Sequence, residues 1–308
     1  EYIEIPGGLY IVEKCTKGEV FLVLLKIGRN KVEIIENQLR NIVEKQRNSV
    51  GLLYSGGLDS SIIAKILITL IPPSSVAVVS VGLPDSVDLN NATIGAKELG
   101  IKLHKCLLTQ KLVLEAVETL KQMSIIYNPV DLSIAIPIFL GLQTLAHDFD
   151  VKTVFLGQGA DEIFVGYQKY VQLYEMGDHE AVKKAMIFDL QKLQKSQIVR
   201  EQKIAQYFGL DLIYPFLDPK IIEHAYSYSI QSHLAYMSQG NIVRKAQLRK
   251  LAKTIGLSDS LTNRPKKAIQ YGSGTIKLLK NIAKSNNYQN IPEWFQSSFS
   301  PNLYRMKF

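Results

Sequence analysis

Apolar positions along the chain recur at two spacings, one typical of strands and the other of helices. Residues 1–30 hold two runs of branched and aromatic side chains on either side of the turn sequence TKGE, which predicts an N-terminal β-ribbon. Helices are predicted where apolar residues recur every three to four positions, at 31–47, 60–70, 91–100, 110–124 and 133–147. Short apolar runs between them predict buried strands, at 49–54, 75–83, 101–108 and 152–157.

Strands that alternate with helices predict an α/β fold, a doubly wound parallel sheet with helices on both faces. A ligand of such a fold binds at the carboxyl ends of the strands, where the strand order reverses. From about residue 170 the pattern is mainly helical, and residues 286–308 are polar and aromatic without a clear period. We expect these last residues to form a tail, anchored by Trp294, that docks on the protein or contacts a partner.

Composition narrows the setting. The 308 residues include two cysteines without metal-like spacing, and the first residues, EYIEIPGG, do not resemble a signal peptide. We find no apolar stretch that reaches the length of a bilayer span, so we expect a cytoplasmic protein without membrane contact. The formal net charge of +8 permits a polyanionic partner such as tRNA. The basic residues are spread from Lys183 to Lys280, which also fits a solvated surface and a basic nucleotide pocket.

The stretch LLYSGGLDSS lies where a predicted strand meets a predicted helix. Its glycines allow a tight turn and a close approach of backbone N–H groups to a ligand, and its serines begin the helix, where free N–H groups favour an anion. A glycine turn with a serine cap would account for the glycines and one serine but not for Asp59, because a carboxylate repels a phosphate unless Mg²⁺ bridges them. The stretch therefore predicts a phosphate–metal site, without the lysine of a G-x-x-x-x-G-K-[ST] loop.

A second polar stretch, VFLGQGADEIFVGYQKY, also follows a predicted strand. Taken alone, its GADE segment could be a helix cap followed by an acidic first turn. Beside the first stretch, this explanation of GADE is less favoured.

These stretches resemble a known family. The pattern S-G-G-x-D-S-S resembles the PP-loop of ATP pyrophosphatases, and the second stretch resembles S-G-E-G-[AS]-D-E-x-F-x-G-Y of asparagine synthetases. The segments SVGLPDSVDLNNA, LIYPFLDPKIIEHA and RPKKAIQYGSG follow in the family order, so residues 48–280 are similar to an asparagine synthetase domain. The segment KKAIQYGSG is also similar to asparagine-synthetase-domain-containing proteins. The resemblance implies an adenine nucleotide alpha hydrolase-like fold over 48–285, with 1–47 resembling the trailing edge of a glutaminase domain and 286–308 as the tail.

The resemblance also implies a reaction. In this family ATP is cleaved between its α and β phosphates, a carboxylate (here best assigned as aspartate) becomes an acyl adenylate, and ammonia or an amine attacks it. The implied cofactors are ATP and Mg²⁺, with Asp59 and Asp161 as metal ligands. The implied catalytic residues are Lys266, Asp161, Gln158 and Glu162. The implied nucleotide-binding residues are Leu53, Ser55, Gly56, Gly57, Asp59, Ser60, Ser61, Val81 and Gly157.

Three positions depart from the family pattern. The family's glutaminase begins with a catalytic cysteine, whereas this sequence begins with Glu1, so we expect either missing upstream sequence, free ammonia, a separate glutaminase subunit or another amine. Gln158 replaces a glutamate and cannot act as a base at neutral pH, and Ile213 replaces an arginine. The alternatives are therefore a PP-loop enzyme that adenylates a tRNA base and a non-catalytic nucleotide-binding subunit. A homodimer is a further expectation.

Overall fold

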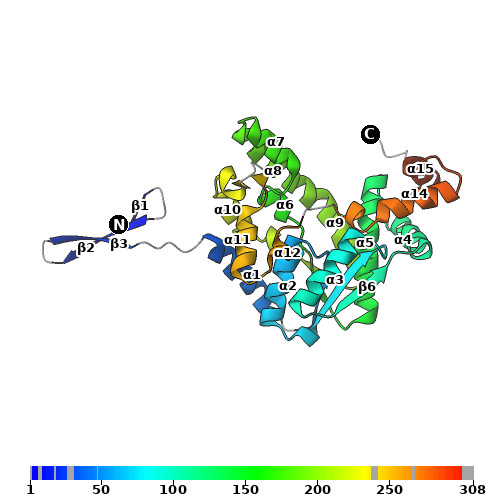
Figure 1. Ribbon diagram of the computed structural model, residues 1–308, viewed down its shortest axis with the longest axis horizontal. Helices are drawn as coiled ribbons and strands as arrows, with labels where there is room; N and C mark the ends of the chain where they lie inside the picture. The colour runs from blue at the N-terminus through cyan, green and yellow to red at the C-terminus, as the bar shows by residue number, and fades with distance from the viewer. Residues whose placement is uncertain are drawn as a thin grey trace.

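The computed structural model describes residues 2–5, 9–16, 19–25, 31–46, 48–236, 242–264 and 268–299, with backbone alone for the first three ranges. The first three ranges form β1 (Tyr2–Ile5), β2 (Leu9–Thr16) and β3 (Glu19–Leu25), which pair antiparallel in that order. The predicted β-ribbon is confirmed, with one strand more than the two apolar runs indicated. It is followed by α1 (Lys31–Glu44) (Figure 1).

A five-stranded parallel sheet forms the centre of the molecule, in the order β6-β5-β4-β7-β8. Its strands are β4 (Val50–Leu53), β5 (Val76–Gly82), β6 (Leu103–Leu107), β7 (Thr153–Phe155) and β8 (Asp211–Ile213). Four of them were predicted. β8 was not, because the chain beyond about residue 170 was predicted to be mainly helical.

The strand order reverses between β4 and β7. The chain runs from β4 through β5 to β6 on one side, then returns to the other side of β4 as β7. In a doubly wound sheet this reversal opens a crevice at the carboxyl ends of the two strands. The two polar stretches follow β4 and β7 directly, so both lie at that crevice.

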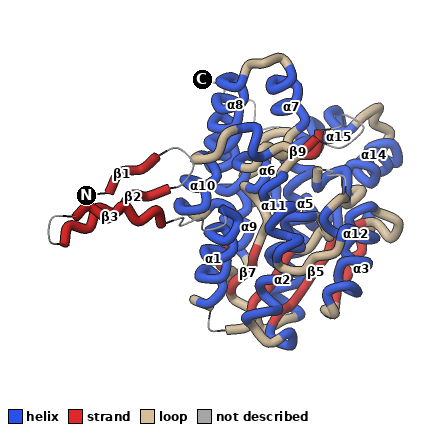
Figure 2. Tube along the Cα trace, turned by 60° about the vertical axis from the view of Figure 1, so that its left-hand side comes forward, coloured by secondary structure: helices blue, strands red, loops and turns tan. Residues whose placement is uncertain are grey.

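Alternate residues of β5 pack into two cores, one on each face of the sheet. Val76 and Val78 belong to the first core, and Ala77 and Val79 to the second. Figure 2 shows the strands (red) covered by helices (blue) on both sides. Helices of the first core are α1, α2 (Leu58–Leu70), α3 (Val87–Leu99), α10 (Pro219–Tyr226) and α11 (Ala246–Thr254). Helices of the second are α4 (Gln110–Gln122), α5 (Pro129–Asp148), α9 (Val199–Tyr207), α14 (Thr275–Ser285) and α15 (Ile291–Phe299).

Helix α5 corrects the expectation about membrane-length segments. Among the described residues it is one helix whose length and apolar composition suffice to cross a membrane, and 61% of its most apolar window is buried inside the protein. Our reading of the sequence missed it because Ser133, Pro137, Gln143 and Thr144 interrupt the apolar run. In the structure α5 packs against β5 and forms the middle of the second core.

The second half of the chain is mainly helical, as predicted. Helices α7 (Gln168–Glu175) and α8 (His179–Lys192) form a small third core, and α8 continues through a π-helical turn, Leu193–Ile198, into α9. Short helices and strands complete the described chain: Pro73–Ser75, α6 (Ala160–Ile163), Pro215–Leu217, Ile230–His233, β9 (Ala235–Tyr236), β10 (Ile242–Val243), α12 (Asp259–Thr262) and α13 (Ile269–Gly272).

Residues 286–299 are more ordered than the tail that we expected. They form α15, whose Trp294 and Phe295 are buried in the second core, and Trp294 is 4% exposed. Its apolar residues Ile291, Trp294, Phe295 and Phe299 do recur at helical spacing, but over little more than two turns, and the sequence analysis gave no helix there. Trp294 is an anchor, as expected, and residues 300–308 lie outside the described chain.

Candidate active site

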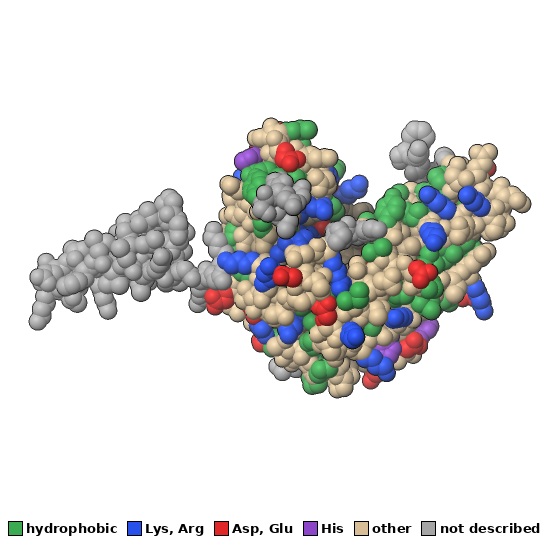
Figure 3. Space-filling view, in the orientation of Figure 1, with side chains coloured by type: hydrophobic (Ala, Val, Ile, Leu, Met, Phe, Trp, Pro, Cys, Tyr) green, Lys and Arg blue, Asp and Glu red, His purple; other side chains and the backbone are tan. Residues whose placement is uncertain are grey.

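A cavity of about 660 Å³ opens at the crevice between β4 and β7. This volume is within the usual range for small-molecule sites. Its walls come from the loops after β4, β5 and β7, from α5, and, among the other described residues, from 242–245, 249, 263–264 and 268–270. On the face drawn in Figure 3, lysine and arginine side chains gather near the middle of the molecule. The cavity therefore has the size and the place expected of a small-molecule site, and its described lining holds both cationic and anionic side chains.

Most of the residues predicted for the site line this cavity. They are Leu53, Ser55, Gly57, Asp59, Ser60, Val81, Gly157, Gln158, Asp161 and Glu162. Gly56 forms the turn beneath it. Ser61 is fully buried, and its hydroxyl lies 3.0 Å from that of Tyr54, away from the cavity. Lys266 lies outside the described residues, so its role stays a prediction.

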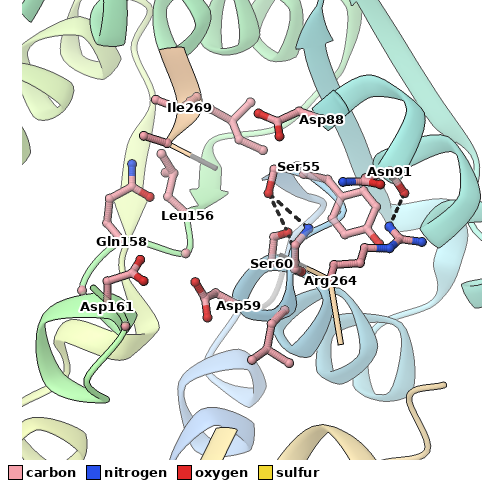
Figure 4. A pocket seen from close by; sticks show the side chains of 18 of the residues that line it. Ser55, Asp59, Ser60, Asp88, Asn91, Leu156, Gln158, Asp161, Arg264 and Ile269 are labelled. Atoms are coloured by element: carbon pink, nitrogen blue, oxygen red, sulfur yellow. Dashed lines mark hydrogen bonds between the residues drawn. The ribbon is translucent and has the colours of Figure 1, made fainter. Parts of the chain in front are cut away.

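The loop after β4 is held in shape by its glycines and serines. Gly56 has φ +69°, and a Cβ there would lie 2.4 Å from the backbone of Asn91 and of Ala92 on α3. Gly57 then caps α2 without any side-chain hydrogen bond to the helix N–H groups. The Ser55 and Ser60 hydroxyls lie 3.2 Å apart above this turn (Figure 4). The loop thus presents hydroxyls and the start of a helix to an anion.

Arg264 ties this loop to α3. Its Nη1 donates to the backbone oxygen of Gly56 at 3.0 Å and to that of Asn91 at 2.7 Å. Figure 4 shows it beside Asn91, next to the Ser55–Ser60 pair. Arg264 was not predicted, because no local sequence pattern connects an arginine 208 positions away with this loop.

The loop after β7 brings its acidic residues into the interior. Gly159 has φ +93°, and a Cβ there would lie 2.3 Å from a methyl carbon of Leu217. Asp161 and Glu162 follow, each 5% exposed. The Tyr167 hydroxyl donates to Glu162 at 2.6 Å. Burial raises the pKa of Glu162, and the hydrogen bond from Tyr167 opposes that shift.

Lys245 joins the two loops. Its Nζ lies 2.6 Å from Oδ2 of Asp59 and 2.8 Å from Oδ1 of Asp161, and its side chain is 6% exposed. It precedes α11 with φ +57°, a conformation that is uncommon for a residue with a side chain. Burial lowers the pKa of the Lys245 ammonium, and Asp59 opposes the shift. No sequence signal distinguishes this lysine from its basic neighbours in NIVRKAQLRK.

The two carboxylates fit a magnesium ion that also contacts phosphates. Oδ1 of Asp59 is buried and has no hydrogen-bond partner within the described part of the chain. The loops after β4 and β7 are adjacent here, since a Cβ at Gly157 would make an ordinary contact with Cβ of Asp59, at 3.4 Å. The described residues contain no group of three or more His, Cys, Asp or Glu that could hold a metal by itself. Mg²⁺ commonly binds one or two carboxylates and takes its other ligands from phosphates and water.

A buried carboxylate lies behind Gln158. Oε1 of Glu201 accepts from Nε2 of Gln158 at 2.8 Å and from Nε2 of Gln197 at 2.9 Å, and its Oε2 accepts from the Tyr214 hydroxyl at 3.0 Å. Burial raises the pKa of Glu201, and these three hydrogen bonds oppose the shift. Glu201 is 1% exposed and was not predicted, because it belongs to a different helix, 43 positions from Gln158.

The sequence of this chain is similar to a known family and to proteins of known sequence. The family described as asparagine synthase matches residues 35–178 and 171–299. A Methanocaldococcus jannaschii protein named "Putative asparagine synthetase (glutamine-hydrolyzing) 1" is 32% identical over 289 residues, which are 83% of this chain and 52% of that protein. The asparagine synthetase (glutamine-hydrolyzing) of Gallus gallus is 25% identical over 249 residues, 79% of this chain and 43% of that protein. The chain thus spans about half the length of these relatives.

Solved structures give a more distant likeness. The NMN synthetase of Francisella tularensis aligns with a TM-score of 0.44 and 10% identity, over 88% of this chain and 98% of that one. The NH3-dependent NAD synthetase of Campylobacter jejuni aligns with a TM-score of 0.34 and 15% identity, over 66% of this chain and 93% of that one. TM-scores this low carry no argument about chemistry.

Proposed function

Because this chain belongs to the asparagine synthase family, we propose that it is an ATP-dependent C–N ligase that activates a carboxylate as an acyl adenylate. The observation that carries the proposal is the meeting of Asp59 and Asp161, from two different loops, at one buried ammonium in a nucleotide-sized cavity. A site that only bound an anion would gain nothing from two convergent carboxylates. A site for a magnesium-bound polyphosphate needs them.

The nucleotide would lie across the ends of β4 and β5. The hydroxyls of Ser55 and Ser60 and the start of α2 suit the β and γ phosphates. Leu53 and Val81, beside α5, offer an apolar wall for the adenine. Asp59 and Asp161 would hold Mg²⁺, which when bound offsets the charge of the departing pyrophosphate.

The reaction follows from this placement. A carboxylate oxygen of the substrate bonds to the α phosphorus, the bond to the bridging oxygen breaks, and pyrophosphate leaves with the electron pair. An amine nitrogen then bonds to the acyl carbon, the bond from that carbon to the phosphate oxygen breaks, AMP leaves with the electron pair, and the nitrogen loses a proton to solvent. Lys266 would stabilise charge in one of these steps and stays a prediction, as do aspartate as the carboxylate, a glutaminase partner or ammonia as the nitrogen source, and a cytoplasmic location.

The test is pyrophosphate release with ATP, Mg²⁺ and aspartate or other carboxylates, each with and without ammonium chloride. We expect pyrophosphate release that depends on a carboxylate. In Asp59→Asn we expect the rate of release to fall about 100-fold, because the metal ion loses a ligand and the charge of the transition state is stabilised less. The matched control is Asp259→Asn, since Asp259 is an exposed aspartate that pairs with Lys253 away from the cavity.

Two outcomes would overturn this proposal. Release that requires tRNA, with salt-dependent binding of tRNA, would identify the enzyme as one that adenylates tRNA. ATP binding without release in any mixture would identify a nucleotide-binding subunit without catalysis. Equal release by Asp59→Asn and Asp259→Asn would remove Asp59 from the mechanism.

A further inference from the structure

Arg264 holds three segments of the chain together at the wall of the cavity. Its Nε donates to the backbone oxygen of Ser260 at 2.9 Å, and its Nη1 donates to those of Gly56 at 3.0 Å and Asn91 at 2.7 Å. These oxygens belong to α12, to the loop after β4 and to α3. Within the described residues each of these hydrogen bonds goes to the backbone, so the guanidinium constrains the path of the chain.

The bond to Gly56 determines where the next N–H group of the loop points. A trans peptide is planar, and its C=O and N–H point in opposite directions. Because Arg264 takes the oxygen of Gly56 on the side of α3, the N–H of Gly57 is turned to the other side of the loop. There it donates to the Ser55 hydroxyl at 3.3 Å, and Ser55 and Gly57 both line the cavity (Figure 4). The arginine therefore helps to aim a backbone N–H at the cavity.

A cluster on α3 and α12 fixes the segment that holds the guanidinium. We call Glu98, Ser258 and Ser260 the α3–α12 clasp: each serine hydroxyl donates to one oxygen of the Glu98 carboxylate, and the two hydroxyls lie 3.0 Å apart. These hydrogen bonds lower the pKa of Glu98, so the acceptor is ionised and both bonds are charge-assisted. Next to the clasp, Leu261 is 1% exposed, and its methyl carbon lies 3.0 Å from the place of a Cβ at Gly95 on α3. Polar and apolar contacts thus hold α12 on α3.

Phosphate oxygens bind best to N–H groups that already point at them, because no reorganisation is then needed. We propose that Arg264, held by the α3–α12 clasp, is a positioning residue that keeps the N–H of Gly57 turned toward the β and γ phosphates of ATP. It acts through the backbone of the loop rather than by its charge. This inference rests on the nucleotide site of the proposed function and adds the residues that shape that site from outside the loop.

The competing explanation is that Arg264 attracts the phosphates by its positive charge. Lysine distinguishes the two explanations, because it keeps the charge but lacks the planar guanidinium that donates in fixed directions. A positioning role predicts that Arg264→Lys binds polyphosphate as weakly as Arg264→Met. Attraction by charge predicts that Arg264→Lys binds it like the wild type.

Arg264→Lys is therefore the first test. Isothermal titration in the presence of Mg²⁺ measures the Kd of ATP, of pyrophosphate and of AMP. We expect the Kd of ATP and of pyrophosphate to rise about 10-fold, which is the loss of one hydrogen bond to a charged group. The Kd of AMP should change less than about 2-fold, because AMP has no β or γ phosphate to lose the contact. The matched control is Arg40→Lys, since Arg40 pairs with Glu36 at 2.8 Å on α1 and does not line the cavity.

A second variant, Glu98→Gln, keeps the inference testable if Arg264→Lys does not fold. An amide oxygen accepts from one hydroxyl, but the amide NH₂ cannot accept from the other, so the clasp loses its charge and one hydrogen bond. We expect the Kd of ATP and of pyrophosphate to rise about 3-fold, less than in Arg264→Lys because the packing of Leu261 remains. The Kd of AMP should again stay unchanged. The matched control is Glu118→Gln, since the two oxygens of Glu118 accept from Lys121 at 2.9 and 3.1 Å, away from the cavity.

The outcomes separate this inference from the proposed function. Wild-type affinity for pyrophosphate in Arg264→Lys, or in Glu98→Gln if only that variant folds, would overturn the positioning role and leave the ligase intact. An equal loss of affinity for AMP would also overturn it, because the change would then extend beyond the phosphate loop. ATP binding by the wild type without carboxylate-dependent exchange of pyrophosphate into ATP would overturn the ligase alone. A wild type that binds neither ATP nor pyrophosphate would overturn both.

Discussion

Lys245 holds two carboxylates together in a place from which water is largely excluded. Its ammonium is within 2.8 Å of both Asp59 and Asp161. Burying three charges is costly, and removing one member of such a group leaves the others uncompensated. The lysine therefore balances part of the negative charge of the two carboxylates.

Replacing this lysine should expose that cost. We expect Lys245→Met to lower the free energy of unfolding by about 3 kcal/mol, as breaking a buried ion pair does, measured by urea denaturation. Added Mg²⁺ should recover part of the loss, because the two carboxylates then have a cation to share. The control is Lys253→Met, whose partner Asp259 is 3.1 Å away and exposed. Exposed pairs contribute little, so equal losses in the two variants would contradict this account.

His233 is a second residue whose charge state depends on burial. It is 1% exposed, its Nε2 donates to the backbone oxygen of Ala225 at 3.1 Å, and its Nδ1 is buried without a partner in the described residues. Burial lowers the pKa of this imidazole to about 4. A second proton on Nδ1 would have no acceptor, so the folded protein holds the neutral ring.

This pKa predicts how stability depends on pH. The unfolded chain binds the proton near pH 6.5 and the folded protein only near pH 4, so the contribution is complete above pH 6.5 and is lost as the pH falls toward 4. The loss amounts to about 3 kcal/mol. We expect urea denaturation at pH 7 and pH 4 to show a smaller difference for His233→Gln than for the wild type. His179→Gln, at an exposed position, should keep the wild-type difference, and parallel curves for all three proteins would refute the assignment.

At the scale of elements, the loop after β4 depends on a glycine for two separate reasons. Gly56 has φ +69°, which favours glycine, and it also lies against α3, where a Cβ would meet the Asn91 backbone. Gly100, at the end of α3, has nearly the same φ, +67°, but nothing within 4 Å of the place of its Cβ. Comparing Gly56 with Gly100 therefore separates the effect of a positive φ from the effect of the contact with α3.

Alanine at these two glycines should have unequal effects. Gly100→Ala carries only the cost of a left-handed backbone, about 1 kcal/mol, and should leave ATP binding unchanged. Gly56→Ala must also move the loop away from α3, so we expect ATP affinity to fall about 10-fold or more, because the loop loses its fit to the phosphates. Isothermal titration with ATP and Mg²⁺ measures both. Equal affinities for the two variants would show that the contact with α3 does not shape the site.

At the scale of the whole molecule, the strand order assembles the site. Asp59 and Lys245 are 186 positions apart in the chain and are joined by one ion pair. Because β4 and β7 are neighbours that point the same way, their carboxyl ends deliver both polar loops to one crevice. Helices on both faces bury the sheet and leave that edge as the place for a ligand.

The sequence by itself determined the elements and the loops that carry the chemistry. Strand and helix spacing, the glycines of the loop after β4 and the acidic stretch after β7 are local patterns, and local backbone preferences act over a few residues. The resemblance to asparagine synthetases extended these patterns to Asp59 and Asp161 as a pair, and the structure brings both to one cavity. The short β8 was missed because it lies in a part of the chain that was predicted to be helical, and α15 because its apolar spacing repeats over little more than two turns.

Only the tertiary structure decided the partners of those residues. Lys245 between the carboxylates, Arg264 on the loop and Glu201 behind Gln158 are each joined to the site by contacts across 43 to 208 positions of sequence. In the sequence they are ordinary charged residues, and the folded chain alone shows that Lys245 and Glu201 are buried. The reason is physical: the effect of a charge depends on its solvation and its neighbours, and these are set when distant segments pack together.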